Sequence, residues 1–244
     1  MLLSVTVCGG LWCFGAWEMW WFWPFSTVLF LSFSVFLLRV LHKPSGFRFV
    51  DDEGRVLLLG FGCVLPFLFY AVIRAVMTEV TDTALRSVFM FIQPVLVFVM
   101  VVLSFSLQQL RLFGRLLVIN LALLALYAAI NMAITGSELI LWRSSLASGI
   151  TSGRATGTFF NPDHFATVMG IGVSLGLGFV LARREDSEKV WLRRGIGGGL
   201  VLLCGLVIGL SLSRGAGIAV LGTFLVALIW SGFQWPRPRR WVLQ

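Results

Sequence analysis

Charged residues are scarce in this sequence: they make up 12% of its 244 residues, and only 11 residues are acidic. Hydrophobic residues make up 58% of the chain, and the mean hydropathy is +0.94. These values lie far outside the range of a soluble globular domain. The composition therefore excludes a soluble enzyme or binding domain and predicts a polytopic membrane protein.

Motifs for metal or nucleotide chemistry are also missing. The sequence contains no HExxH zinc motif, no P-loop and no paired metal-ligand spacing. Its cysteines lie within apolar runs and have neither metal nor redox spacing, so we interpret them as packing residues; they are Cys8, Cys13, Cys63 and Cys204. We therefore expect neither a metal nor a cofactor.

The positive charge does not indicate a nucleic-acid-binding protein, although the formal net charge is +8. Basic residues form short clusters between apolar runs rather than one patch that is interleaved with aromatic residues. Lysine and arginine beside membrane spans are what the positive-inside rule predicts. We therefore expect membrane lipids as partners and no nucleic acid.

Apolar runs recur along the whole chain, at lengths near the roughly 20 residues that a helix needs to cross a bilayer. They predict about eight spans: Leu2 to Trp17, Pro24 to Leu41, Val56 to Ile73, Ser87 to Leu107, Leu116 to Ile134, Phe165 to Ala182, Gly195 to Leu212, and Gly215 to Ser231. The glycine pairs Gly172/Gly176 and Gly205/Gly209 predict close helix crossings. We expect an all-α fold, a single transmembrane helical bundle over residues 1–244 with no soluble domain.

The distribution of basic residues predicts the orientation of these spans. Fourteen of the 19 lysines and arginines fall in one set of alternate connections, and the others are Arg74, Arg86, Arg143, Arg154 and Arg214. The positive-inside rule places the richer set, and with it both termini, in the cytoplasm. The segment from Thr135 to Asn161 and the break at Ser213 to Gly215 then face outward.

The stretch RATGTFFNPDHFA, from Arg154 to Ala166, is polar in an otherwise hydrophobic region. Asn161 is a preferred N-cap residue, and Pro162 suits the first helical position because its missing N–H costs nothing there. A carboxylate at Asp163 complements the positive end of the helix. The pattern predicts that a membrane-spanning helix begins here, with Arg154 beside its N-terminus, a combination that attracts anions.

A second arginine has the same setting, because Ser213-Arg214-Gly215 opens the last predicted span. An arginine close to hydrocarbon needs a partner or a watery cavity, and its planar fork suits phosphate. Alternatively, both Arg154 and Arg214 lie at the headgroup level and contact lipid phosphate.

His164 falls at the third position of the predicted helix, next to Asp163. A histidine there can transfer protons or hydrogen-bond a ligand, and it can equally be structural. The sequence therefore offers His164 and Asp163 as weak catalytic candidates and leaves the catalytic group otherwise unknown.

These two motifs resemble those of the O-antigen ligase and O-antigen polymerase family of bacterial inner-membrane proteins. That family carries an Arg-x-x-Gly-x-Phe-x-Asn-Pro-Asn-like motif followed by a Ser-Arg-Gly motif. The matching positions are Arg154, Gly157, Phe159 or Phe160, Asn161, Pro162, Ser213, Arg214 and Gly215. Asp163 stands where asparagine is commoner in the family.

The resemblance implies a multi-pass, metal-independent glycosyltransferase that acts at the periplasmic face in lipopolysaccharide or other surface polysaccharide assembly. Its donor would be an undecaprenyl-diphosphate-linked glycan, and its acceptor a lipid or a glycan. Arg154 and Arg214 would bind the diphosphate, while Gly157, Asn161, Pro162, Ser213 and Gly215 would shape the site.

This sequence differs from the family pattern in the region after the Ser-Arg-Gly motif. Members of the family have further spans and a large periplasmic loop that carries more catalytic residues, including a histidine. We therefore expect residues 1–244 to be the N-terminal part of a longer architecture: a fragment, a split gene product or a degraded relative. The choice between ligase and polymerase activity stays open. Two rival functions also stay open: a transporter or flippase of anionic lipid-linked sugars, and a non-catalytic membrane remnant or scaffold.

Overall fold

The computed structural model describes residues 2–13, 15, 19–42, 52–78, 80–140, 143–144, 153–182 and 187–233. The regular secondary structure of these residues is helical apart from one hairpin of two-residue strands, so the predicted all-α class is confirmed. The chain divides into two compact units. Unit 1 comprises Met1–Gly10 and Ala16–Arg115, and unit 2 comprises Leu11–Gly15 and Leu116–Gln244.

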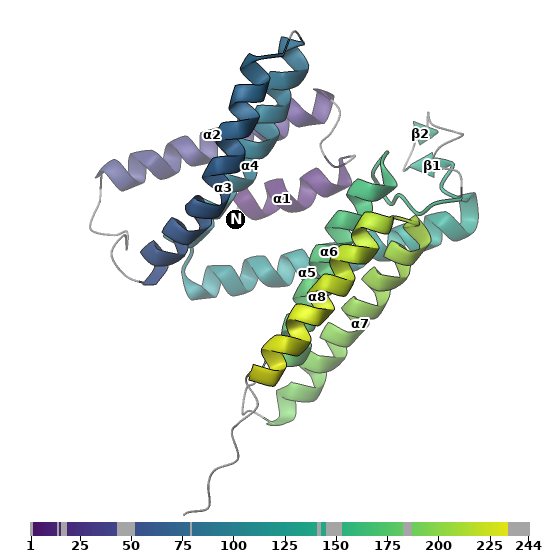
Figure 1. The fold of residues 1–244 in the computed structure, drawn as a ribbon. Helices are drawn as coiled ribbons and strands as arrows, with labels where there is room; N and C mark the ends of the chain where they lie inside the picture. The colour runs from purple at the N-terminus through teal and green to yellow at the C-terminus, as the bar shows by residue number, and fades with distance from the viewer. Residues whose placement is uncertain are drawn as a thin grey trace, which may run out of the picture. The chain divides into compact units, whose positions relative to one another are not determined.

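Unit 1 is built from four helices: α1 (Leu2–Trp12), whose last two residues belong to unit 2, α2 (Met19–His42), α3 (Asp52–Val76) and α4 (Thr81–Ser104). Helices α3 and α4 lie side by side as a hairpin (Figure 1). Aromatic rings join α2 to α4, because Phe89 contacts Trp23 and Phe30 edge to face at centroid distances of 6.0 and 5.7 Å. Gln93 Nε2 also donates to Ser26 Oγ at 2.7 Å.

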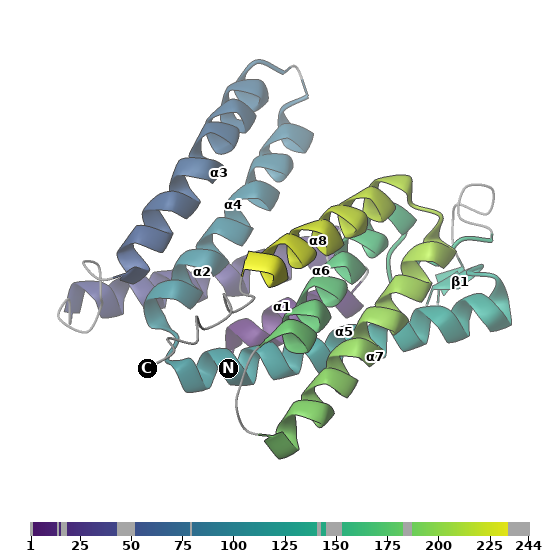
Figure 2. The same cartoon turned by 60° about the horizontal axis from the view of Figure 1, so that its bottom comes forward.

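Unit 2 contains most of α5 (Leu107–Thr135), the antiparallel strands β1 (Leu139–Ile140) and β2 (Arg143–Ser144), and helices α6 (Pro162–Leu181), α7 (Ser187–Ser211) and α8 (Arg214–Phe233). Helix α6 packs against both α7 and α8 (Figure 2). The core is apolar, and its fully buried side chains include Leu121, Leu124, Phe165, Met169, Val173, Cys204 and Val207.

The contact between α6 and α7 depends on glycine residues, as predicted for one of the two glycine pairs. A Cβ on Gly172 would lie 2.5 Å from Cys204 Sγ, and one on Gly176 would lie 2.7 Å from the carbonyl oxygen of Gly197. The predicted crossing at Gly172/Gly176 is therefore confirmed. The prediction for Gly205/Gly209 is wrong, because a Cβ at either position meets no atom of the described residues within 4 Å; these glycines lie on a face of α7 that points away from α6.

The structure also tests the packing role of the cysteines. Cys204 is buried against α6, as predicted. Cys8 and Cys13 are half-buried, and the side chain of Cys63 lies outside the described residues.

Five of the described helices contain segments that are long and apolar enough to cross a membrane: Trp20–His42, Arg86–Ser104, Gln108–Thr135, Pro162–Leu181 and Val190–Ser211. This confirms the predicted membrane character. Shorter apolar segments occupy the helices at the remaining predicted spans, at Leu3–Trp12, Val64–Val76 and Arg214–Ile229. The total of eight spans therefore stays a prediction.

The predicted orientation also stays a prediction. Helix α1 ends at Trp12, and Trp17, where the first predicted span ends, lies outside the described residues. So do many of the basic residues on which the orientation rests: Lys43, Arg48, Arg183, Arg184, Arg237, Arg239 and Arg240.

Candidate functional site

Helix α6 begins where the sequence predicts. Asn161 has extended backbone angles (φ −105°, ψ 116°), and its side-chain oxygen accepts a hydrogen bond from the Asp163 N–H at 2.8 Å. Pro162 is buried at the first helical position. The cap satisfies one of the N–H groups that a helix start leaves without a partner, and the Phe165 N–H donates to the Asn161 carbonyl at 3.2 Å.

The loop before α6 is folded tightly against the core, with residues 155–159 all buried. Gly157 has φ +57°, a left-handed conformation, and a Cβ there would lie 2.5 Å from the Phe165 ring. Glycine is required at this position for both reasons. The Ala155 N–H donates to the Leu210 carbonyl at 2.9 Å, which attaches the loop to the end of α7.

Residues near the N-terminus hold the other side of this loop. Thr158 Oγ1 donates to the Leu11 carbonyl at 2.6 Å, and a Cβ on Gly15 would lie 2.4 Å from the Phe159 ring. Trp12 Nε1 donates to Asn120 Oδ1 at 2.8 Å, which joins the same segment to α5. Sequence reasoning missed this support, because the contacting residues are more than a hundred positions apart and no local pattern marks them.

Arg154 is held in place by two hydrogen bonds. Its Nε donates to the Ser211 carbonyl at 2.7 Å, and its Nη2 donates to Asp163 Oδ1 at 3.1 Å. Its side chain is 24% exposed, while that of Asp163 is 58% exposed. A guanidinium has five N–H donors, so these two bonds orient the group and, among the described residues, occupy two of its five donors.

The turn from α7 to α8 presents the second arginine. Leu212 has φ +54°, and the buried Ser211 hydroxyl accepts from the Ser213 N–H at 3.3 Å. Ser213 Oγ accepts from the Ala216 N–H at 3.4 Å, which is the geometry of an N-cap. Helix α8 therefore begins at Arg214, as the Ser-Arg-Gly motif predicts, and Arg214 is exposed there.

An open cavity of about 670 Å³ joins these elements. Both predicted arginines line it, and so do the first residues of α8 and one acidic side chain: the lining consists of Arg154, Asp163, Thr167, Leu212, Ser213, Arg214, Gly215 and Ala216. Two guanidinium groups and the first turns of α6 and α8 thus meet at one open cavity, which favours a bound anion.

No family model, no curated protein and no solved structure matches this chain. Functional inference therefore rests on the chain's own residues and on the resemblance of its two motifs.

The remaining predicted site residues lie beside this cavity rather than in its lining. Gly157, Asn161 and Pro162 shape the loop and the start of α6. His164 is exposed on the first turn of α6. Within the described ranges, no group of three or more histidine, cysteine, aspartate or glutamate side chains is arranged to hold a metal ion.

Proposed function

We propose that this chain is the membrane-embedded part of an O-antigen ligase-like glycosyltransferase of a bacterial inner membrane. In this proposal, the cavity lined by Arg154 and Arg214 binds the diphosphate of an undecaprenyl-diphosphate-linked glycan. The observation that supports it is the convergence of both arginines and the N-termini of α6 and α8 on one open cavity.

A diphosphate suits this cavity in charge and in shape. Each guanidinium can hold two phosphate oxygens through its planar fork, and the two helix N-termini add partial positive charge. The cavity volume of about 670 Å³ lies within the range of small-molecule sites, which is about 300–1,000 Å³.

The same groups can contribute to glycosyl transfer. The acceptor hydroxyl oxygen bonds to the sugar C1 as the bond from C1 to the phosphate oxygen breaks, and the diphosphate leaves with the bonding electrons. Cations held ready at the leaving group stabilise the negative charge that develops there. The hydroxyl proton must pass to a base, and Asp163 is better placed than His164 because it lines the cavity.

One observation favours a rival function. The contact between Arg154 and Asp163 is also what a purely structural ion pair would show, as expected in a non-catalytic membrane scaffold. The two alternatives differ in whether a diphosphate competes for Arg154.

The test is binding of undecaprenyl diphosphate to the full chain in lipid nanodiscs. Arg154→Ala and Arg214→Ala should each weaken binding about tenfold, since a charge-assisted hydrogen-bond pair is lost. Arg194→Ala is the matched control, because Arg194 is exposed on α7 away from the cavity and its loss should change little. Unchanged binding in both cavity variants would contradict the proposal and favour the scaffold.

Transfer and transport are then separated with a lipid-linked glycan donor and an acceptor. A longer protein that contains this segment should transfer glycan, and both arginine variants should impair the transfer. The 244-residue chain alone should bind the donor without transferring it. Movement of the donor across the bilayer without bond formation would favour the transporter instead.

A further inference from the structure

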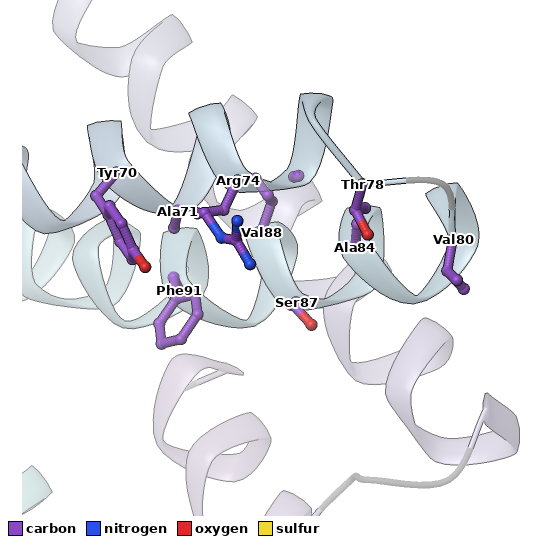
Figure 3. A pocket seen from close by; sticks show the side chains of 10 residues that line it. Tyr70, Ala71, Arg74, Thr78, Val80, Ala84, Ser87, Val88 and Phe91 are labelled. Atoms are coloured by element: carbon purple, nitrogen blue, oxygen red, sulfur yellow. The ribbon is translucent and has the colours of Figure 1, made fainter.

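A second hollow lies within unit 1, between the C-terminal end of α3 and the N-terminal end of α4. Its volume is about 520 Å³, and no step of the proposed function uses it. Arg74 lies in the last turn of α3 and extends toward α4, between Phe91 and Ser87 (Figure 3). The hydroxyl groups of Tyr70 and Thr78 also line this hollow, which we call the α3–α4 groove.

The positive charge of Arg74 distinguishes the groove chemically, since the other described side chains that line it are neutral. Arg74 is exposed, and it stands at the end of an apolar helix segment, Val64–Val76. An arginine beside hydrocarbon is stabilised by an anion or by water. The nearby acidic residues Glu79 and Asp82 have side chains outside the described residues.

An exposed apolar stripe continues the groove away from its polar end. Its members recur every three or four residues and therefore share one face of each helix. They are Pro66 and Tyr70 on α3, and Phe91, Pro94 and Phe98 on α4.

The opposite face of α4 is already covered within unit 1. Phe89 packs against two aromatic residues of α2, and Gln93 bonds to Ser26. The α4 residues of the stripe thus lie on the face of α4 that α2 leaves open. From Arg74 through the groove to the stripe, polarity falls toward the middle of the helices.

We infer that the α3–α4 groove binds one anionic glycerophospholipid, with its phosphate at Arg74 and an acyl chain along the aromatic stripe. A phospholipid has the same order of groups: a charged phosphate, then ester oxygens, then hydrocarbon. The planar fork of arginine holds phosphate oxygens, and the hydroxyls of Tyr70 and Thr78, on either side of Arg74 (Figure 3), suit ester and headgroup oxygens of the lipid. A zwitterionic headgroup binds less well, because its ammonium group opposes Arg74. This site does not depend on the proposed glycosyl transfer.

The experiment measures lipid binding to the full chain by native mass spectrometry, with phosphatidylglycerol as the probe and phosphatidylcholine as the comparison. The intact chain should bind one phosphatidylglycerol molecule more tightly than any further phosphatidylglycerol molecules. Arg74→Gln should weaken that binding about tenfold and abolish the preference over phosphatidylcholine. Arg39→Gln is the matched control: Arg39 is exposed in the last turn of α2 but is absent from the groove, so its loss should leave the preference unchanged.

A second variant tests the shape of the groove without changing its charge. Ala84 lines the groove, and Ala84→Leu should fill part of it and weaken phosphatidylglycerol binding while Arg74 remains. The inference is overturned if Arg74→Gln keeps the lipid preference, or if Arg39→Gln loses it equally. Equal binding of the two lipids by the intact chain would also overturn it.

Discussion

Neutralising Asp163 should make the cavity at Arg154 bind a diphosphate more tightly. Asp163 Oδ1 accepts a hydrogen bond from Arg154 Nη2 at 3.1 Å and lines the same cavity. A bound diphosphate therefore competes with this carboxylate for the guanidinium and is repelled by its charge. Asp163→Asn removes the charge and keeps a side-chain oxygen of similar size and position.

The expected gain is modest because the pair is accessible to water. The Asp163 side chain is 58% exposed, and an exposed ion pair is worth about 0.2–1 kcal/mol. A like charge in a water-filled cavity adds a repulsion of about 0.5 kcal/mol. Together these terms predict that binding tightens about three- to twelvefold. The gain should shrink as salt rises, because salt screens exposed charges.

Titration of undecaprenyl diphosphate onto the full chain in nanodiscs measures this gain. Glu138→Gln is the matched control, because it removes the same charge from an exposed residue that does not line the cavity, and it should leave the dissociation constant unchanged. Asp163 also lies in the first turn of α6, so its loss lowers the stability of the helix by about 0.3–1 kcal/mol. The variant is therefore expected to fold less stably while it binds the diphosphate more tightly. Weaker binding by Asp163→Asn would refute the reasoning and indicate that Asp163 positions Arg154 for the ligand.

Three further predictions concern orientation, catalysis and packing. A reporter enzyme active only in the periplasm should give signal when fused after Ser152 and none when fused after Ser187; the reverse pattern would overturn the charge-based orientation. Arg214→Lys should impair glycan transfer by a longer protein containing this segment, because a point charge replaces only part of a bidentate phosphate contact; full activity in membranes with matched protein levels would contradict the diphosphate site. Gly172→Ala should lower the free energy of unfolding by about 1–3 kcal/mol through overpacking, whereas Gly205→Ala, which faces open space, should not destabilise the protein; equal thermal shifts would contradict the packing described for α6 and α7.

The starts of α6 and α8 were predictable because helix capping is local. Asn161 and Pro162 lie next to the N–H groups that they affect, and their residue types alone favour a helix start. Ser213 caps α8 through an N–H only three residues away. Such contacts need no knowledge of the remaining chain.

The backbone partner of Arg154 was not predictable from the sequence. Ser211 is 57 residues away along the chain, and nothing in either local pattern indicates that they meet. The glycine pairs show the same limit: both have the same spacing, yet Gly172 contacts α7 while Gly205 faces open space. Spacing shows that two residues share a helix face, but it does not show which face meets a neighbour.

The sequence by itself determined the helical class, the membrane character, the beginning of two helices and the residue types suited to an anion. These properties follow from hydrophobicity and from interactions within a few residues. Only the tertiary structure decided that Arg154 and Arg214 line one cavity, that Arg154 donates a hydrogen bond to Asp163, and that Leu11 and Gly15 contact the loop. Those contacts depend on how helices distant in the chain pack, and packing follows from the complementary shapes of whole helix faces, which no local pattern encodes.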